Sequence, residues 1–386
     1  MTVSEIGFGT WGLGGDSYGP VNDASSREAL RLAFDRGVTF YDTSDLYGNG
    51  HSEEILGEVF HDVRDRIVIG TKVGTLPHSG FYMPQDFSEA NINRSIDASL
   101  RRLRTDRVDL YQLHSPQIDL SNWDEIIATL DRIRDSGKIR VYGISARSPA
   151  DAKVAVDRYG FHVVQVNFNL IDHRAVESGL FDVCAKKEVG VIARTPLCFG
   201  YLSGKLTGDE DFPGRDHRKN WPREQLRRWA RAHALFTPLN EGRSRTLVQL
   251  ALQFCLSDNA VSTVIPGMIS CEEVMENTAV ADLAPVTKEE SAAICEIYRS
   301  GIFYDPEAKG TPRPESWEGN AVGGSQYRER PHLSAIVREQ EPCKTPAIRV
   351  HSCGARNTRY SPAWRLQYLT GEPSSKSGRL KEGRRC

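Results

Sequence analysis

The sequence lacks any long apolar run that could serve as a membrane anchor. No stretch of its 386 residues approaches the roughly 18 consecutive apolar residues of a transmembrane helix. The first ten residues have neither the charged region nor the long apolar region of a signal peptide. The formal net charge is only −2, so no overall field favours nucleic acid or an anionic membrane surface.

A paired-cysteine motif is also missing. The eight cysteines are irregularly spaced, and none of them stands in a CxxC pair. This pattern argues against a disulfide framework and against a zinc site. We therefore expect reduced thiols, a cytoplasmic location and no bound metal.

The composition changes near Tyr304. Residues 306–386 contain 15 Lys and Arg, 8 Glu and no Asp, and they are rich in Pro, Gly and Ser. The apolar residues of this part show no period. We therefore expect one folded domain over residues 1–304, followed by a basic tail of low order over residues 305–386.

Short β-branched segments alternate with amphipathic segments over residues 1–304. Each short segment has the composition of a strand that is buried on both faces. Eight strands are predicted at residues 6–10, 38–42, 66–72, 108–114, 140–145, 163–167, 189–194 and 261–266. Helices are predicted between them at residues 23–36, 51–60, 88–103, 123–136, 149–158, 177–188, 243–257 and 270–280. Asp23 and Ser88 are the expected N-caps of the first and third helices. This alternation predicts a closed, parallel (β/α)8 TIM barrel.

A doubly wound dinucleotide-binding sheet is the alternative fold. Gly7, Gly9 and Gly12 spell G-x-G-x-x-G after the first predicted strand. In a dinucleotide-binding fold this motif opens a helix directly. Here LGGDSYGPVN follows it, and no helix can begin until about Asp23. We therefore favour the barrel.

Polar residues stand at the ends of three consecutive predicted strands. Catalytic groups of such barrels lie at these C-terminal ends. The residues are Asp42, Lys72 and His114, and Tyr47 follows Asp42 by five positions. A free tyrosine has a pKa of about 10, which a nearby ammonium group lowers. We expect Tyr47 to donate a proton, Lys72 to lower its pKa, and Asp42 to keep Lys72 charged. His114 would orient a carbonyl oxygen or share in the proton transfer. Alone, Asp42 or Lys72 is more often a rim residue, Tyr47 is most often a packing residue, and His114 is as often a satisfied half-buried histidine. The combination of all four favours this chemistry.

This DxxxxY, Lys and His set resembles the catalytic tetrad of the aldo-keto reductases. The similarity covers most of residues 3–300 and is carried, in family order, by VSEIGFGTWGLGG, GHSEEILG, TKVG, RRLRTDRVDLYQLHSP, GKIRVYGISA, VVQVNFNL, RTPLCFGYLSGKL and VIPG…EEVMEN. The resemblance implies NAD(P)H-dependent reduction of aldehydes, ketones or sugars to alcohols, with Tyr47 as the general acid. It implies a small carbonyl substrate as partner, without nucleic acid, membrane or metal, and leaves the oligomeric state open.

The resemblance also implies a cofactor site. Ser145 and Gln165 match the residues that bind the nicotinamide carboxamide, and Ala146 stands where the family often has Asn. Arg194 matches the residue that stacks on the nicotinamide ring. The other implied contacts lie at the first strands, at a pyrophosphate loop and at an adenosine-side loop: Gly9, Thr10, Trp11, Asp42, Thr195, Leu197, Gly200, Leu202, Lys205, Pro266, Gly267, Ser270, Glu273 and Asn277.

The sequence also leads to an expectation about the choice between NADH and NADPH. NADPH-dependent members hold the 2′-phosphate with a Lys or Arg after the last strand, but residues 265–277 contain neither. We therefore expect NADH to be accepted at least as well as NADPH, unless the arginine-rich segment 214–228 supplies the charge. Substrate choice would rest on the loops at 74–87 and 199–222. The aromatic residues expected to line the pocket are Trp11, Phe81, Tyr82, Phe199 and Trp221.

Two other interpretations remain at this point. Some proteins that resemble this family are nucleotide-sensing subunits of ion channels with slow turnover, although the intact tetrad favours an enzyme. Family members also usually begin with a hairpin that covers the barrel floor. This sequence has no counterpart of it before Val3, and its tail does not resemble the family's ending. An incorrect gene model with an inactive product is therefore a third hypothesis.

Overall fold

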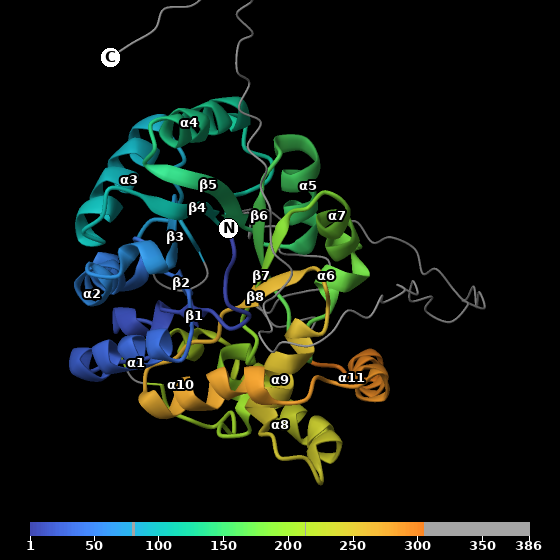
Figure 1. Ribbon diagram of the computed structural model, residues 1–386. Coiled ribbons are helices and arrows are strands. Elements are labelled where there is room, and N and C mark those ends of the chain that lie inside the picture. Colours follow the sequence, from blue (N-terminus) through green and yellow to red (C-terminus); the bar gives the residue numbers. More distant parts are fainter. Residues whose placement is uncertain (79–81, 213, 305–386) are drawn as a thin grey trace, which may run out of the picture.

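The computed structural model describes residues 1–78, 82–212 and 214–304. In these ranges, eight parallel strands form one sheet in the order β1 to β8, and helices surround it (Figure 1). The strands are β1 Phe8–Gly9, β2 Phe40–Asp42, β3 Val68–Val73, β4 Val108–His114, β5 Ile139–Ser145, β6 Val163–Asn167, β7 Gly190–Arg194 and β8 Val261–Val264. The predicted (β/α)8 barrel is confirmed. The expected tail, residues 305–386, lies outside the described residues.

Glycines close the barrel between its first and last strands. Ile6 and Gly9 form parallel bridges to Val264 and Gly267, and Gly9 N donates to Pro266 O at 2.9 Å. A Cβ atom at Gly9 would lie 2.9 Å from Ile265 O, so only glycine allows this approach. The glycine motif therefore serves strand closure, and the dinucleotide-binding interpretation of it is wrong.

The predicted helices are found with shifted bounds. They are α1 Asp23–Asp35, α2 His51–Phe60, α3 Glu89–Arg102, α4 Trp123–Asp135, α5 Pro149–Tyr159, α7 Leu180–Lys186, α9 Leu247–Leu256 and α10 Cys271–Thr278. Ser88 caps α3 as expected, accepting from Asn91 N at 3.3 Å. The expected cap at Asp23 is wrong. Asn22 Oδ1 accepts from the backbone N–H groups of Ala24 and Ser25, because its backbone is extended while Asp23 is already helical.

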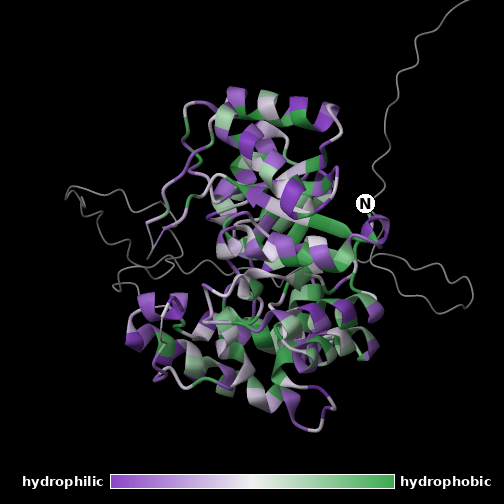
Figure 2. Cartoon of the chain, turned by 90° about the vertical axis from the view of Figure 1, so that its left-hand side faces the viewer, coloured by the Kyte–Doolittle hydropathy of each residue, from purple (hydrophilic) through white to green (hydrophobic). Residues whose placement is uncertain are grey.

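Three helices were not predicted. A short α6, Arg174–Glu177, precedes α7 and is separated from it by Gly179 at φ 70°. Helix α8, Arg223–Phe236, occupies part of the arginine-rich segment, and α11, Lys288–Ser300, follows α10. Figure 2 shows hydrophobic and hydrophilic residues side by side on the outer helices, as expected for amphipathic helices that cover a barrel.

The barrel interior is divided between an apolar floor and a polar mouth. Five buried side chains form the floor: Phe40, Leu110, Val141, Ile192 and Ile265. Met1 and Val3 pack against them. Further along the inward-facing side of β4, Gln112 and His114 follow Leu110 at alternate positions. Polar groups therefore collect at the C-terminal ends of the strands, where the candidate site lies.

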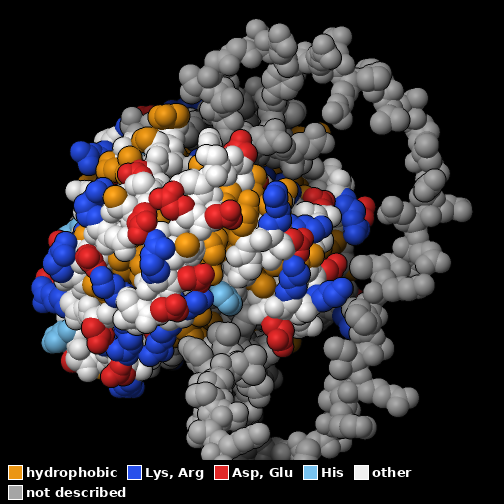
Figure 3. Space-filling model, turned by 90° about the horizontal axis from the view of Figure 1, so that it is seen from above, with side chains coloured by type: hydrophobic (Ala, Val, Ile, Leu, Met, Phe, Trp, Pro, Cys, Tyr) orange, Lys and Arg blue, Asp and Glu red, His pale blue; other side chains and the backbone are white. Residues whose placement is uncertain are grey.

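None of the helices in the described part of the chain combines the length and apolar composition that a bilayer crossing requires. Figure 3 shows Lys and Arg side chains interspersed with Asp and Glu on one face. Many of these charges pair across neighbouring helices, as Arg27 does with Glu58 at 2.7 Å.

Candidate active site

The strand ends bring the four tetrad residues together. Asp42 ends β2, Lys72 is the penultimate residue of β3, and His114 ends β4. Tyr47 begins the 3-10 helix η2, Tyr47–Gly50, which follows β2. Lys72 Nζ lies 2.7 Å from Asp42 Oδ2 and 2.9 Å from Tyr47 Oη. The rings of Tyr47 and His114 are perpendicular, with centroids 6.1 Å apart. The predicted clustering of these residues is therefore found.

Glycines hold Tyr47 in place over the mouth. A Cβ atom at Gly14 would lie 2.5 Å from Gly48 N, and one at Gly48 would lie 2.4 Å from Gly14 O. Gly48 has φ 61°, which favours glycine. The loop before α1 and the loop that carries Tyr47 therefore touch backbone to backbone.

Burial controls the protonation states of the tetrad. Burial raises the pKa of Tyr47 above its ordinary value, although Lys72 and Arg194 act against this. The expectation of a lowered Tyr47 pKa is therefore wrong, because the sum of all effects raises it. The effect of Lys72 alone has the expected direction, since it lowers the pKa of Tyr47. Burial also opposes the charge on Lys72, but Asp42 and Tyr47 outweigh it and raise the pKa of Lys72. Tyr47 is thus a phenol and Lys72 an ammonium at neutral pH.

Burial also keeps His114 neutral. Its pKa lies well below the ordinary value because of burial and because Lys72 and Arg194 repel an added proton. A neutral imidazole has one N–H donor and one acceptor nitrogen. His114 is therefore suited to give or receive one hydrogen bond at the mouth rather than to act as a charged acid.

A network of amide side chains fixes Asp42. Its Oδ1 accepts from Gln165 Nε2 at 2.7 Å and from Gln112 Nε2 at 3.1 Å. Ser145 Oγ donates to Gln165 Oε1 at 3.2 Å. Ser145 and Gln165, predicted from the sequence, thus lie beside the tetrad. Gln112 was not predicted, although its place two residues before His114 on β4 points it to the same side.

Arg194 brings a second cation to the mouth. Its Nη2 donates to Ala146 O at 3.0 Å, at the position where the sequence departs from the family pattern. Its Nε is buried and has no hydrogen-bond partner within the described ranges. Burial lowers the pKa of Arg194, and Tyr47 and Asp42 are among the groups that favour its charge.

The loop after β7 carries the expected pyrophosphate residues. Thr195, Phe199 and Gly200 all have positive φ, at 54°, 58° and 95°. Thr195 Oγ1 donates to Asn167 Oδ1 at 2.6 Å, and Leu202 N donates to Leu197 O at 3.1 Å. The Thr195 hydroxyl is therefore engaged with the end of β6, and the Leu202 N–H is engaged within the loop itself.

Lys205 ends this loop and reaches α10. Its side chain is exposed, and its Nζ lies 3.8 Å from Glu276 Oε2. On α10, Ser270 accepts from Glu273 N at 3.3 Å, and Glu273 Oε2 accepts from Ile269 N at 2.7 Å. Asn277 is buried and Gly267 is exposed. The residues expected around the pyrophosphate and the adenosine therefore lie in adjoining segments.

Thr10 does not face the mouth. It has no exposed surface, and its Oγ1 donates to Asp42 O at 3.0 Å and accepts from Ser52 Oγ at 2.7 Å. Its side chain therefore supports the backbone of Asp42 and leaves no free group for a cofactor. Trp11 does lie beside the site, with its ring centroid 6.2 Å from that of Tyr47.

The segment before α8 folds over the loops at the mouth. The ring of His217 lies 4.4 Å from that of Trp11 and 5.1 Å from that of Phe199. His217 N and Nδ1 both contact Ser17 O at 2.8 Å. No sequence pattern predicted this histidine, because its contacts join residues about 200 positions apart.

The expected aromatic pocket is found only in part. Trp11 and Phe199 flank His217, but Trp221 is buried against Trp229 with ring centroids 5.0 Å apart. Tyr82 is 63% exposed, and Phe81 lies outside the described residues. Trp221 therefore packs against α8, and the Tyr82 side chain stays largely exposed.

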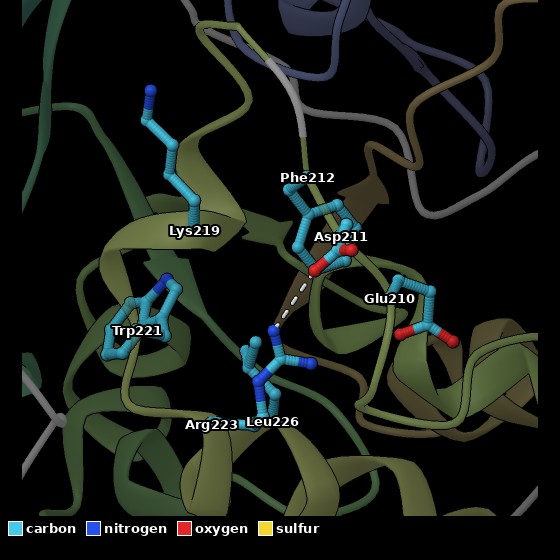
Figure 4. A pocket seen from close by; sticks show the side chains of 7 residues that line it. All are labelled: Glu210, Asp211, Phe212, Lys219, Trp221, Arg223 and Leu226. Atoms are coloured by element: carbon cyan, nitrogen blue, oxygen red, sulfur yellow. Dashed lines mark hydrogen bonds and ion pairs between the residues drawn. The ribbon is translucent and has the colours of Figure 1, made fainter.

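A separate hollow of about 520 Å³ lies beside this segment (Figure 4). Its lining residues are Glu210, Asp211, Phe212, Lys219, Trp221, Arg223 and Leu226. Arg223 pairs with Asp211 across it at 3.3 Å. It shares no residue with the tetrad, so the chemistry is to be sought at the strand ends.

Comparison with known proteins identifies the family of this chain. The family model described as Aldo/keto reductase family matches residues 5–299. The chain belongs to this family. It is therefore an oxidoreductase, and its strand-end tetrad occupies the matched region.

Individual relatives match the barrel over nearly their whole length. This aldo-keto reductase is 31% identical over 307 residues to the uncharacterized oxidoreductase YqkF of Bacillus subtilis, covering 78% of this chain and 95% of the relative. The glycerol dehydrogenase AKR11B4 from Gluconobacter oxydans has a similar structure, with a TM-score of 0.67 and 29% identity over 79% of this chain and 94% of that one. An aldo/keto reductase from Klebsiella pneumoniae, solved with NADP and acetate, has a TM-score of 0.59 and 27% identity, covering 77% and 92%.

Proposed function

We propose that this aldo-keto reductase reduces the carbonyl group of small aldehydes, ketones or sugars to an alcohol, with NAD(P)H as hydride donor and Tyr47 as general acid. One observation carries the proposal: Lys72 Nζ bridges Asp42 Oδ2 and Tyr47 Oη in a buried site. A phenol beside a paired ammonium is suited to release its proton only when negative charge develops on a neighbouring oxygen.

The residues at the mouth fit a nicotinamide group. Ser145 and Gln165 offer a hydroxyl and an amide 3.2 Å apart, which suit the donors and acceptors of a carboxamide. Arg194 offers a flat guanidinium whose buried Nε lacks a partner among the described residues. When bound there, the nicotinamide would supply the hydride to the carbonyl carbon.

Each tetrad residue then has one task. Tyr47 gives its hydroxyl proton to the carbonyl oxygen as the hydride arrives. Lys72 stabilises the resulting phenolate, and Asp42 holds Lys72 both charged and in place. His114 hydrogen-bonds the same oxygen and orients the carbonyl. Such acid catalysis typically contributes about 10²–10⁴-fold to the rate.

We further propose that NADH is accepted at least as well as NADPH. Residues 265–277 hold no cation, and Glu273 closes the backbone of this loop by accepting from Ile269 N. In the arginine-rich segment, Arg218 pairs with Asp216 at 2.6 Å, and Lys219 donates to Gly214 O. These two cations are therefore engaged elsewhere. The Klebsiella relative binds NADP, so this preference is the part of the proposal that most needs measurement.

Turnover with a panel of carbonyl compounds tests the function. The oxidation of NADPH and NADH would be followed with small aldehydes, hydroxyketones and sugars. The panel would include the oxidation products of glycerol, because one similar structure is that of a glycerol dehydrogenase. The proposal requires turnover with at least one class and its loss in Tyr47→Phe. Binding of the nucleotide without turnover of any member of the panel would instead favour a nucleotide-sensing module.

A further inference from the structure

Ser44 links the side chains of His114 and Asp45 beside the tetrad. Ser44 Oγ lies 3.2 Å from His114 Nδ1 and 3.2 Å from Asp45 Oδ1. It also accepts from Leu46 N at 3.2 Å. Ser44 has no exposed surface, so its hydroxyl must satisfy its hydrogen bonds among these three neighbours. Neither Ser44 nor Asp45 belongs to the tetrad.

A count of donors and acceptors fixes one arrangement of this link when Asp45 is ionised and allows a second when Asp45 is protonated. A serine hydroxyl has one proton and two lone pairs, and Leu46 N–H occupies one lone pair. An ionised Asp45 can only accept, so it takes the Ser44 proton. His114 Nδ1 must then carry a proton and donate to Ser44. A protonated Asp45 can donate to Ser44 through Oδ1, and Ser44 then gives its proton to an unprotonated His114 Nδ1.

We propose that the protonation of Asp45, relayed by Ser44, selects the tautomer of His114 and thereby reverses the hydrogen bond that His114 offers to the substrate oxygen. With Asp45 protonated, His114 carries its proton on Nε2 and donates to a carbonyl. With Asp45 ionised, Nε2 is an acceptor and receives a hydrogen bond from an alcohol hydroxyl. Asp45 and Ser44 are positioning residues, and this role rests on the proposed function of the tetrad.

The charges around Asp45 place this change in an accessible pH range. Burial and the carboxylate of Glu53 on α2 raise the pKa of Asp45 to about 7, against the effects of Ser44, of Arg102 on α3 and of Leu46 N–H. The Tyr111 hydroxyl on β4 also senses the charge of Asp45. Glu53 itself accepts from Arg102 Nε at 2.7 Å, so this pair is fixed beside Asp45.

His114 stays neutral while Asp45 titrates. Three basic groups of the described residues face it, and each disfavours a second proton on the ring: Lys72 on β3, Arg194 on β7 and His78 in the loop after β3. Tyr47 faces it as a phenol. One proton added to Asp45 therefore changes the tautomer of His114 without giving the ring a charge.

The relay matches the two directions of the reaction. Carbonyl reduction takes up one proton from solvent overall and needs a donor at His114 Nε2. Alcohol oxidation releases one proton and needs an acceptor there. Low pH therefore prepares His114 for reduction and high pH prepares it for oxidation, while Tyr47 remains the group that exchanges the proton with substrate.

Nitrogen NMR of the imidazole ring tests the relay without turnover. The protein would be labelled with ¹⁵N-histidine, and the His114 signals assigned by their loss in His114→Gln. Spectra would be recorded from about pH 5.5 to about pH 8.5, a range that brackets the pKa of about 7 of Asp45. We expect the Nε2–H form at low pH, the Nδ1–H form at high pH and a midpoint near that of Asp45. One tautomer throughout, or formation of an imidazolium with that midpoint, overturns the proposal.

Two variants separate the relay from other sources of pH dependence. Asp45→Asn cannot ionise, and Ser44→Ala removes the link, so both should abolish the pH-dependent change of tautomer. Glu54→Gln, an exposed carboxylate on the neighbouring α2, is the matched control and should retain it. Persistence of the change in Asp45→Asn contradicts the proposal, even if Ser44→Ala fails to fold.

The test also distinguishes the relay from the proposed function. If Tyr47→Phe retains full activity, the assignment of the acid is wrong, although the NMR titration of His114 would stand. If Tyr47→Phe is inactive but His114 keeps one tautomer, only the relay is wrong. In active protein, Asp45→Asn should also remove the inflection near pH 7 from the ratio of reduction to oxidation rates.

Discussion

Lys72 Nζ lies 2.9 Å from Tyr47 Oη, and the Lys72 side chain has no exposed surface. An ammonium removed from water in this way needs a counter-ion and further acceptors. Asp42 Oδ2 at 2.7 Å and Thr43 O at 2.8 Å provide them. The position of this charge is therefore fixed before any substrate arrives, and changes at either residue test the proposed chemistry directly.

Tyr47→Phe keeps the ring and removes only the proton donor. We expect kcat for carbonyl reduction to fall by at least about 10², because general acid catalysis is lost. The dissociation constant of the nicotinamide cofactor, measured by fluorescence titration, should change little. Hydride transfer at a near-wild-type rate in stopped-flow measurements would show that another group is the acid.

Lys72→Met keeps most of the side-chain volume and removes the charge. Because Lys72 opposes the rise that burial causes in the pKa of Tyr47, its loss should raise that pKa further. The pH profile of alcohol oxidation, which requires the phenolate, should therefore move to higher pH. Breaking a buried ion pair typically costs about 3–5 kcal/mol, so circular dichroism must first establish that the variant is folded. Lys187→Met, at an exposed pair with Asp157, is the control and should leave the profile in place.

The strand ends were the part of the site that the sequence could predict. Parallel strands of a barrel deliver their C-terminal residues to one rim, so Asp42, Lys72 and His114 follow from the strand pattern alone. The sign of the pKa shift at Tyr47 could not be predicted. The sequence identifies the charged residues near the Tyr47 hydroxyl. The extent to which this hydroxyl is buried depends on how the loops fold, which the sequence pattern does not give.

The missed helices have different causes. In α8, the apolar residues Leu226, Trp229 and Ala230 have helical spacing. The arginines between them made the segment look uniformly polar, so the helix was not predicted. In α11, Thr287 and Glu290 form a capping box that was a visible signal of a helix start. The contacts of His217 with Ser17 and of Ser44 with His114 had no local signal, since each joins segments distant in the chain.

Stability should depend on pH through the buried His173. Burial lowers the pKa of His173 to about 4, and its ring stacks on Tyr298 with centroids 3.9 Å apart. In the unfolded chain this histidine takes up a proton below about pH 6.5, whereas in the folded state it stays neutral to about pH 4. The unfolded state therefore binds more protons in this window, and stability falls as the pH falls through it.

The magnitude of this loss is measurable. From about pH 8 to about pH 5, His173 alone should reduce the free energy of unfolding by about 2 kcal/mol. Urea denaturation at both pH values measures the change. His173→Phe keeps the stacked ring and should show a smaller pH dependence, whereas the exposed His61→Gln should behave like wild type. An equal pH dependence in His173→Phe and wild type would exclude His173 as the source.

Cofactor preference is the prediction that runs against the NADP-bound relative. The carboxylate of Glu273, held by Ile269 N at 2.7 Å, lies where the resemblance expects the adenosine side of the cofactor. A 2′-phosphate carries about −1.5 to −2 charges near neutral pH and would be repelled there. Solvent and salt reduce such a repulsion to roughly 1 kcal/mol. We therefore expect kcat/KM for NADH to equal or exceed that for NADPH.

In Glu273→Gln, whose amide oxygen can keep the Ile269 bond, the ratio of kcat/KM values should shift about three- to tenfold toward NADPH. Glu289→Gln, in the first turn of α11, is the control and should leave the ratio unchanged. A strong NADPH preference in the wild-type protein would contradict the prediction. Lys205, the cation that reaches α10 through Glu276, would then be the first side chain to replace.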